Sequence, residues 1–318
     1  MGTLSQKSVV LDGSNEYIVV GNVAALQFER TNAFSLSAWV QLTSTGTRMV
    51  CAKGSGSSGY SLYVTNGQVF FDLVNAFPAN TIEVRTGNVL LPTGAWTHLV
   101  ATYDGSSTAA GVAIYFNGTS IPLTTNYDTL SASILNANAF DIGRRSDGYY
   151  WGGGIDAVAV YNKQLSGAEV TAIHNGYDPP DLTVTGPTAN LVGYWKIGDG
   201  DTYPTATDSS ASGNNGTYTN TESTDIVNYG AGVQTIDDPN LPYNFDSLGL
   251  AGNSYDIIPT GLDSGGGAAP TYYKMRALAD PGPGYVTWVV ANTPDFAGTY
   301  APSAIQAGTV IVGASWVG

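Results

Sequence analysis

The sequence contains very little cysteine, histidine, lysine and glutamate. Its 318 residues include a single cysteine, Cys51, so no disulfide can form within the chain. The two histidines, His98 and His174, lie far apart in the sequence, and no histidine metal cluster or Ser-His-Asp triad is indicated. Charged residues make up only 11% of the chain. The surface must therefore be carried mainly by Ser, Thr, Asn and Gly.

Positive charge is scarce as well. Eleven Lys and Arg residues stand against 25 Asp and Glu residues, which gives a net charge of −14 and a pI near 4.2. An acidic surface repels the phosphate backbone, so we expect no nucleic-acid partner. Such a surface suits divalent cations and soluble assemblies, although simple solubility explains it equally well.

Long apolar runs are also missing. None approaches the roughly 18–20 residues of a membrane span, and residues 1–20 lack the apolar region of a signal peptide. We expect no membrane span, and synthesis and folding in cytoplasm without a cleaved leader. Release from the cell would then occur as part of a particle.

The abundant residues are those of an all-β protein. The chain has 40 Gly, 20 Tyr and 6 Trp, and apolar residues alternate with polar ones over 34–42, as in a strand with one buried face. Asn66-Gly67 predicts a tight hairpin between strands at 60–64 and 68–73. A strand over 96–103 is expected to pair with one over 112–116.

One helix is expected. Ser166 and Glu169 have the spacing of a capping box, in which each side chain satisfies a free backbone donor. Leu165 and Val170 stand where a hydrophobic staple would pack, and Gly176 fits the residue after the last helical turn. This short helix is expected to cover one end of a sandwich.

The C-terminal part of the chain differs in character. Residues 228–245 are rich in turn formers and are predicted to be a linker. Residues 246–318 form a small β-rich segment, with strands expected over 272–277, 285–291 and 309–317. A segment with so few strands is marginal alone, so we expect it to anchor the protein to partners or pack on the sandwich.

Five sequence motifs occur in the same order as in a known family. Through these motifs the chain resembles the laminin-G-like, pentraxin-related concanavalin A superfamily. The resemblance implies a two-sheet antiparallel jelly-roll sandwich. The residues that carry it are Val10-Leu11-Asp12-Gly13 with Tyr17-Ile18-Val19, Phe34 to Val40, Trp96 to Gly105, Val112 with Tyr115 to Gly118, and Gly154 to Asn162 with Leu165, Ser166, Glu169 and Val170.

One departure from the family pattern concerns the order of the strands. A Tyr-Trp strand and an Asp-Ser-Ser-type turn usually precede the first of these motifs. Here the matching residues, Gly193-Tyr194-Trp195 and Asp208 to Thr217, follow the capping helix. The domain resembles a circularly permuted one, so we extend it over residues 1–227. Permutation is tolerated when the original termini lie close together at the surface.

The layout is similar to that of laminin-G-like proteins of tailed-bacteriophage particles. This resemblance implies a non-catalytic virion protein, a capsid decoration or a tail or fibre component, present in many copies or as a homo-oligomer. The C-terminal segment would bind other capsid or tail proteins. The alternative is a carbohydrate-binding adhesin that recognises host surface glycans.

The resemblance also implies a structural calcium ion. The Asp of the Ile-Asp-x-Val strand, Asp156, would bind Ca²⁺ beside the first Asp-Gly motif, with Asp12 and Asn15 as its neighbours. Calcium requires six to eight oxygen ligands, and a carboxylate near turn carbonyls provides them. The alternative is that Asp156 only hydrogen-bonds the adjacent turn.

The sequence lacks a pair of glycosidase carboxylates. Enzymes that share the sandwich carry Glu-x-Asp-x-x-Glu on one strand, and no glutamate of this chain has that spacing. We therefore expect no enzymatic activity. Gly54 to Gly59 matches G-x-G-x-x-G but precedes a strand, so it is interpreted as a hairpin loop.

A glycan site is predicted near residues 144–151. Tyr149, Tyr150 and Trp151 lie close in sequence to Arg144, Arg145 and Asp147, and sugars bind to aromatic faces flanked by polar groups. We take Tyr149, Tyr150, Trp151 and Arg144 as the candidate ligand-binding residues. The alternative is that one or two of these rings belong to the core.

Overall fold

The chain forms two compact units, residues 1–231 and 232–318. The structure, a computed structural model, describes residues 7–174 and 179–227. In the second unit it describes the backbone of five strands. The first unit ends close to the predicted domain end at 227. The predicted linker 228–245 and Gly176 lie outside the described residues.

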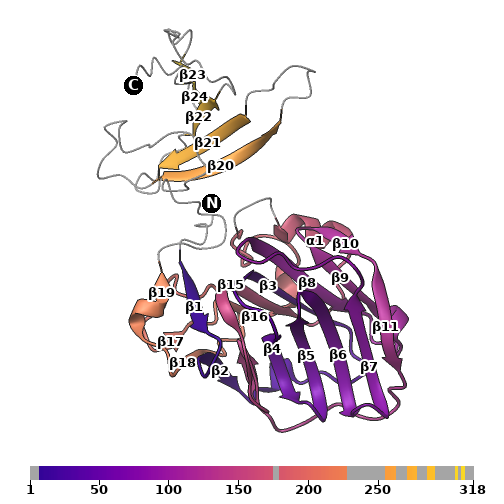
Figure 1. Ribbon diagram of the computed structural model, residues 1–318. Helices are drawn as coiled ribbons and strands as arrows, with labels where there is room; N and C mark the ends of the chain where they lie inside the picture. The colour runs from indigo at the N-terminus through magenta and orange to yellow at the C-terminus, as the bar shows by residue number, and fades with distance from the viewer. Residues whose placement is uncertain are drawn as a thin grey trace. The chain divides into compact units, whose positions relative to one another are not determined.

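Two antiparallel sheets make up the first unit, and they lie face to face (Figure 1). Sheet A has eight strands. Seven of them lie, in spatial order, as β10 (Thr119–Ile121), β9 (Val112–Phe116), β8 (Trp96–Tyr103), β3 (Phe34–Leu42), β15 (Gly152–Tyr161), β1 (Ser8–Asp12) and β19 (Ile226–Val227), and the eighth, β16, pairs with β15. The bounds of β16 are Leu191–Trp195.

Sheet B has nine strands. In spatial order they are β11 (Leu123–Asp128), β7 (Asn80–Thr86), β6 (Gln68–Ala76), β5 (Ser58–Thr65), β4 (Thr47–Ser55), β12 (Phe140–Ile142), β2 (Tyr17–Gly21), β18 (Gly216–Thr219) and β17 (Thr205–Ala206). A separate small hairpin, β13 (Arg144–Arg145) and β14 (Tyr149–Tyr150), joins β12 to β15.

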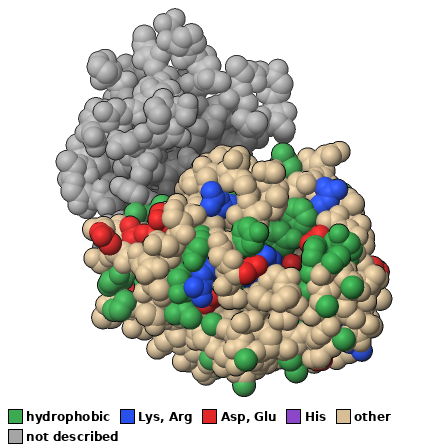
Figure 2. Space-filling model, turned by 60° about the horizontal axis from the view of Figure 1, so that its bottom comes forward, with side chains coloured by type: hydrophobic (Ala, Val, Ile, Leu, Met, Phe, Trp, Pro, Cys, Tyr) green, Lys and Arg blue, Asp and Glu red, His purple; other side chains and the backbone are tan. Residues whose placement is uncertain are grey.

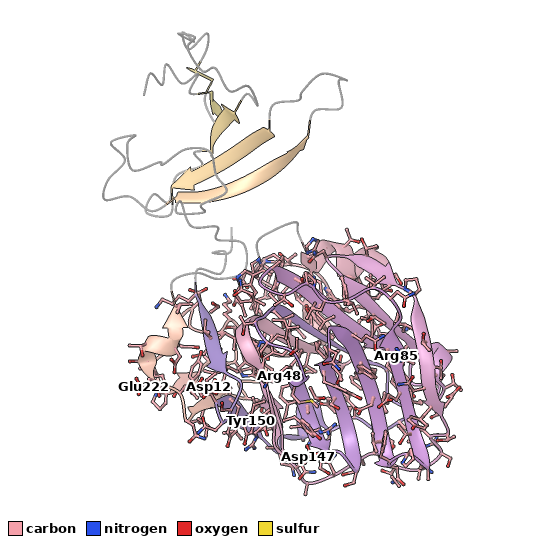
Figure 3. All side chains as sticks on the ribbon, in the orientation of Figure 1. Asp12, Arg48, Arg85, Asp147, Tyr150 and Glu222 are labelled. Atoms are coloured by element: carbon pink, nitrogen blue, oxygen red, sulfur yellow. The ribbon has the colours of Figure 1, made fainter. Side chains whose placement is uncertain are left out.

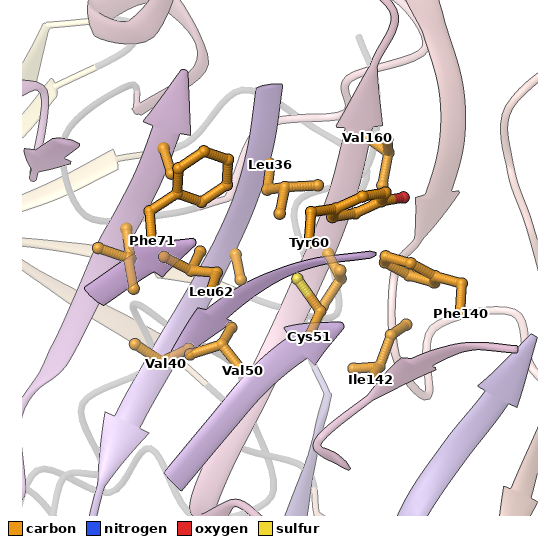
Figure 4. Packing of buried hydrophobic residues seen from close by; sticks show 14 of the residues in the cluster. Leu36, Val40, Val50, Cys51, Tyr60, Leu62, Phe71, Phe140, Ile142 and Val160 are labelled. Carbon is orange, nitrogen blue, oxygen red and sulfur yellow. The ribbon is translucent and has the colours of Figure 1, made fainter. Parts of the chain in front are cut away.

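The core lies between the two sheets. Leu36, Val40 and Val160 of sheet A face Leu62 and Phe71 of sheet B, as Figure 4 shows, and all five side chains are fully buried. The alternation predicted for 34–42 is confirmed, since the residues between these positions point the other way. The prediction of a single buried face was wrong, because the second face is also buried and Trp39 on it belongs to a second apolar cluster. This packing of two apolar faces is the jelly-roll sandwich that the motifs predict.

The strands that follow the helix complete the sandwich. Trp195 of β16 pairs with Val158 of β15, and Tyr218 of β18 pairs with Ile18 of β2. The Trp195 ring is buried and stacks on Phe140 at 5.7 Å between ring centroids. The Tyr-Trp strand is therefore part of the fold, as the permuted order requires.

Helix α1 (Gly167–His174) covers the outer face of sheet A. The capping box is confirmed, because the Ser166 amide donates to a Glu169 carboxylate oxygen and the Glu169 amide donates to Ser166 Oγ. Under the helix, His174, His98 and Trp39 form a group of stacked rings with centroids 5.2–5.5 Å apart. Burial lowers the pKa of His98 to about 3, so this imidazole is neutral.

The short turns follow the sequence signals. Asn66 and Gly67 have φ of 51° and 83°, and Asn117 and Gly118 have φ of 48° and 78°. These left-handed values are those of a tight hairpin. The segment 54–59 is a hairpin between β4 and β5, as expected. None of the helices among the described residues is both long and apolar enough to cross a membrane.

The described part of the second unit is one five-stranded sheet. Its order is β20 (Tyr255–Leu262), β21 (Thr271–Ala277), β22 (Tyr285–Val290), β24 (Thr309–Ile311) and β23 (Ile305–Gln306). The strands predicted over 272–277 and 285–291 are present. The prediction missed β20 and β23. Pro259 and Gly261 interrupt the strand signal in β20.

Candidate functional site on the outer face of sheet B

The hairpin β13–β14 lies against β4, beyond the core. It is held at both ends by backbone hydrogen bonds, since Gly143 N donates to Val50 O at 2.8 Å and Trp151 N donates to Gly143 O at 2.8 Å. Gly148, with φ of 102°, forms its tip. The hairpin therefore presents its side chains to the outer face of sheet B. In Figure 3, Asp147 and Tyr150 lie together near one end of that face.

Arg144 anchors one side of the hairpin. Its Nε and Nη2 donate to Asp141 Oδ2 at 2.9 and 2.7 Å, and its guanidinium lies 3.6 Å from the centroid of the Tyr17 ring. Burial raises the pKa of Asp141 although Arg144 opposes the shift. Tyr150 packs beside Tyr17 with centroids 6.3 Å apart. An arginine paired with a carboxylate and stacked on a ring is held rigidly.

Arg145 reaches from the hairpin across the sheet. Its Nε donates to Asp147 Oδ1 at 2.7 Å, and its Nη1 lies 3.9 Å from Asp72 Oδ2 on β6. The guanidinium carbon is 5.1 Å from the ring centroid of Tyr149 and 5.9 Å from that of Tyr63. Arg145 thus connects the exposed hairpin with the buried polar groups of sheet B.

Asp72 is a buried carboxyl group in the middle of this face, with 4% of its surface exposed. Ser61 Oγ donates to it at 2.5 Å, and Glu83 is its direct partner across the β6–β7 pair. Burial raises the pKa of Asp72 to about 7, against the opposing effects of Ser61 and Arg145. The group therefore changes its charge near neutral pH.

The far side of the face is organised by Glu83. Tyr63 Oη donates to Glu83 Oε2 at 2.8 Å, and Asn126 Nδ2 donates to Glu83 Oε1 at 2.7 Å. Arg85 Nε in turn donates to Asn126 Oδ1 at 3.1 Å. The rings of Tyr63 and Phe70 stack with centroids 4.9 Å apart. Hydrogen bonds therefore fix the polar groups around an aromatic pair.

The exposure of the rings decides which of them a ligand can reach. Tyr149 is 42% exposed, and Tyr150 and Phe70 are half-buried. Acidic, basic and hydrophobic side chains lie close together on the face that Figure 2 shows. Exposed rings next to preorganised charged pairs can stack on a sugar and hydrogen-bond its hydroxyl groups.

Three of the four predicted glycan-binding residues belong to this face, and Trp151 does not. The Trp151 side chain is completely buried in the core, and its Nε1 donates to Gly154 O at 3.1 Å. The inclusion of Trp151 was wrong, because its ring is on the inner side of the sheet. Tyr149, Tyr150 and Arg144 remain as candidates.

The three predicted calcium ligands do not share one site. Asp12 pairs with Gly152 at the end of β1, while Asp156 is four positions further along β15, a separation of about 13 Å at 3.3 Å per residue. Asp12 Oδ1 accepts the amides of Ser14 and Asn15, whereas Asp156 is buried. Calcium binding itself stays a prediction.

No group of three or more His, Cys, Asp or Glu side chains within 7–174 and 179–227 could hold a metal ion. The Asp199-Gly200-Asp201 segment, whose two carboxylates could suggest a metal-binding loop, forms a turn. Asp201 Oδ2 accepts the amide of Gly198, and Asp208 accepts three backbone amides.

The sequence interpretation missed the residues of β5, β6, β7 and β11 that line this face. The signal was present as alternation. Ser61 and Tyr63, Phe70 and Asp72, and Glu83 and Arg85 stand between apolar residues that fill the core, so each pair occupies the outer side of its strand.

The geometry of the sandwich agrees with a comparison of the sequence with family models. The model of the concanavalin A-like lectin/glucanases superfamily, of laminin-G type, matches residues 12–171, half of the chain. The chain belongs to this superfamily. The match ends in helix α1, so the strands β16 to β19 that complete the superfamily's sandwich lie outside it.

No curated protein matches the sequence. Among solved structures, similar chains include a Bacteroides ovatus protein to which carbohydrate binding is assigned by inference (20% identity, 71% of this chain and 60% of that one, TM-score 0.48). A second is the SAP-like pentraxin of Limulus polyphemus, with 15% identity over 55% of this chain and 84% of that one and a TM-score of 0.40. A third is the CBM40 of Ruminococcus gnavus IT-sialidase bound to α2,3-sialyllactose, with 15% identity over 53% of this chain and 98% of that one and a TM-score of 0.42.

The chain therefore spans about 60% of the length of the Bacteroides ovatus protein. Likenesses with TM-scores of this size carry no information about a ligand of this chain. None of the three is a phage protein, and display on a phage particle stays a prediction.

Proposed function

We propose that the sandwich is a non-catalytic, glycan-binding module whose site is centred on the hairpin β13–β14. One observation carries the proposal. The hairpin presents the exposed ring of Tyr149 and the half-buried ring of Tyr150 beside the Arg144–Asp141 and Arg145–Asp147 pairs. Stacking by the rings supplies apolar contact, and the fixed polar groups orient the sugar hydroxyls.

Of the two functions expected from the sequence, glycan recognition is the one that named side chains support. Two of the structural neighbours are carbohydrate-binding proteins by name, but the proposal depends on residues of this chain. Virion display and multi-copy assembly remain compatible with a glycan-binding module, as in an adhesin carried by a particle.

A glycan array followed by calorimetry with the best ligand tests the proposal. Tyr149→Ala is expected to weaken binding at least tenfold, because it removes the most exposed ring of the hairpin. A tenfold loss of affinity corresponds to about 1.4 kcal/mol of binding free energy. Tyr203→Ala, which removes a 38% exposed ring in the segment before β17, serves as the matched control. It should leave the affinity unchanged.

Two outcomes would contradict the proposal. The first is an array with no reproducible binding at millimolar glycan. The second is binding that Tyr149→Ala and Tyr203→Ala affect equally, since this would place the ligand elsewhere. Unfolding curves of both variants establish that each is folded.

A further inference from the structure

The polar groups on sheet B do not end at the hairpin but continue across the sheet in two rows. The pairing register places Ser61, Asp72 and Glu83 side by side on β5, β6 and β7. The same register places Tyr63, Phe70 and Arg85 in the adjacent row. Since neighbouring strands are about 4.8 Å apart, the rows with β11 beside them span about 15 Å.

Asn126 closes the far end of both rows. A register shift between Thr125 and Tyr127 occurs at this point of β11, and the exposed amide of Asn126 joins Glu83 to Arg85. Figure 3 shows Arg85 towards the β7–β11 edge of the sheet, away from Asp147. Hydrogen bonds thus connect β5 and β7 with the edge strand β11, and the Arg145 guanidinium of the hairpin lies over the Tyr63 ring of β5.

Carboxyl groups outnumber guanidinium groups along this face. Arg144 forms an ion pair with Asp141, and Arg145 forms one with Asp147 and lies 3.9 Å from Asp72. Arg85 donates to Asn126, which in turn donates to Glu83. The face therefore sets three guanidinium groups against four carboxyl groups. An anionic sugar would meet this excess of carboxyl groups, in a chain whose net charge is −14.

An uncharged sugar meets no such obstacle. Its hydroxyl groups can donate to the exposed carboxylate of Asp147 and accept from guanidinium and amide hydrogens without breaking an ion pair. The half-buried ring of Phe70, stacked on Tyr63 at an interplanar angle of 15°, offers a second aromatic surface beyond the tyrosines of the hairpin.

We propose that the site extends from the hairpin across β5, β6 and β7 to β11, and that its ligand is an uncharged oligosaccharide. The inference rests on the proposed function, whose site it lengthens and whose ligand class it specifies. The hairpin binds one end of the oligosaccharide. Phe70, Arg85 and Asn126 bind units further along the chain.

The ligand class is tested with an array that presents matched uncharged, sialylated and sulfated glycans. Binding of uncharged oligosaccharides is expected, with an affinity that changes less than twofold between 50 and 500 mM NaCl because no net charge is screened. Exclusive binding of sialylated or sulfated glycans, or a tenfold loss of affinity over that salt range, would overturn the inference and leave the proposed function standing.

The length of the site is tested with Asn126→Ala. We expect a fivefold or larger loss of affinity for a tetrasaccharide and less than a twofold change for the corresponding monosaccharide. Asn162→Ala is the matched control, because Asn162 is also an exposed amide hydrogen-bonded to a side chain, that of Asn190.

Arg85→Gln provides a second variant of the extended face, in case Asn126→Ala alters β11. If both variants bind the tetrasaccharide like the unchanged protein while Tyr149→Ala does not, the site ends at the hairpin and the extension is wrong. If no glycan binds at all, the proposed function fails together with its extension.

Discussion

Asp72 is the residue whose chemistry departs most from what its type suggests. A carboxyl group with 4% exposure and a pKa of about 7 exists in both protonation states near neutral pH. Its neighbours Ser61, Glu83 and Arg145 connect it to the whole candidate face. The charge of that face therefore changes by one unit when Asp72 gains or loses its proton.

Replacement of Asp72 by Asn is expected to change the pH dependence of stability. The unfolded chain ionises Asp72 near pH 4 and the folded chain near pH 7, so the wild type loses stability relative to the variant as the pH rises through this interval. A pKa difference of three corresponds to on the order of 4 kcal/mol.

Urea unfolding of both proteins from pH 4 to pH 8 measures this effect. The free energy of unfolding of Asp72→Asn minus that of the wild type should increase with pH and level off above pH 7. A difference that does not vary with pH would show that Asp72 is ionised in the folded protein at all these values.

At the scale of single elements, the β4–β5 hairpin depends on two glycines that face each other. A Cβ on Gly59 would lie 1.9 Å from Lys53 O, and one on Gly54 would lie 2.0 Å from Ser58 O. The tip of this hairpin contacts the β13–β14 hairpin, because Gly56 N donates to Asp147 Oδ2 at 3.3 Å. The glycine motif therefore has a packing role.

Gly59→Ala is expected to destabilise the domain by more than the cost of its left-handed backbone alone. Gly46→Ala isolates that cost, about 1–2 kcal/mol, because Gly46 has a similar positive φ and nothing within 4 Å of its Cβ position. Thermal or urea unfolding should give Gly59→Ala at least 1 kcal/mol less stability than Gly46→Ala. Equal stabilities of the two variants would mean that β4 and β5 move apart at this point without cost and make room for the added Cβ.

At the scale of the whole chain, the sandwich is complete only with strands that come after the helix. Tyr194 and Trp195 are buried, and β16, β18 and β19 pair with β15, β2 and β1 respectively. A chain that ends before Leu191 would leave the edges of both sheets open and the apolar surface around Phe140 exposed to water.

Two shortened chains test this dependence. A chain of residues 1–231 is expected to unfold cooperatively, with the same transition temperature as this unit has in the full chain. A chain of residues 1–181 is expected to show no cooperative unfolding transition. Trp195→Ala in the longer piece should cost about 3–5 kcal/mol. A cooperative transition of residues 1–181 by calorimetry would contradict the role given to the closing strands.

The sequence was sufficient to predict the sandwich but only part of the candidate site. Alternation over 34–42, the Asn-Gly turns and the Ser166–Glu169 capping box are local signals, and local signals determine strands, turns and helix ends. The Asp72–Glu83–Arg145 group depends instead on the register between strands, which no local pattern contains. Trp151 was misplaced because Gly152-Gly153-Gly154 follow it and no side chains there show which face is buried.

The pairing of β1 with β19 has a consequence for how this domain is built into longer proteins. Val9 lies opposite Ile226, so the polypeptide enters and leaves the sandwich at one place. A host loop could therefore accept the domain as an insert with only a small gap to bridge. Gene fusion in either direction, or insertion between two existing residues, would carry the outer face of sheet B along unchanged.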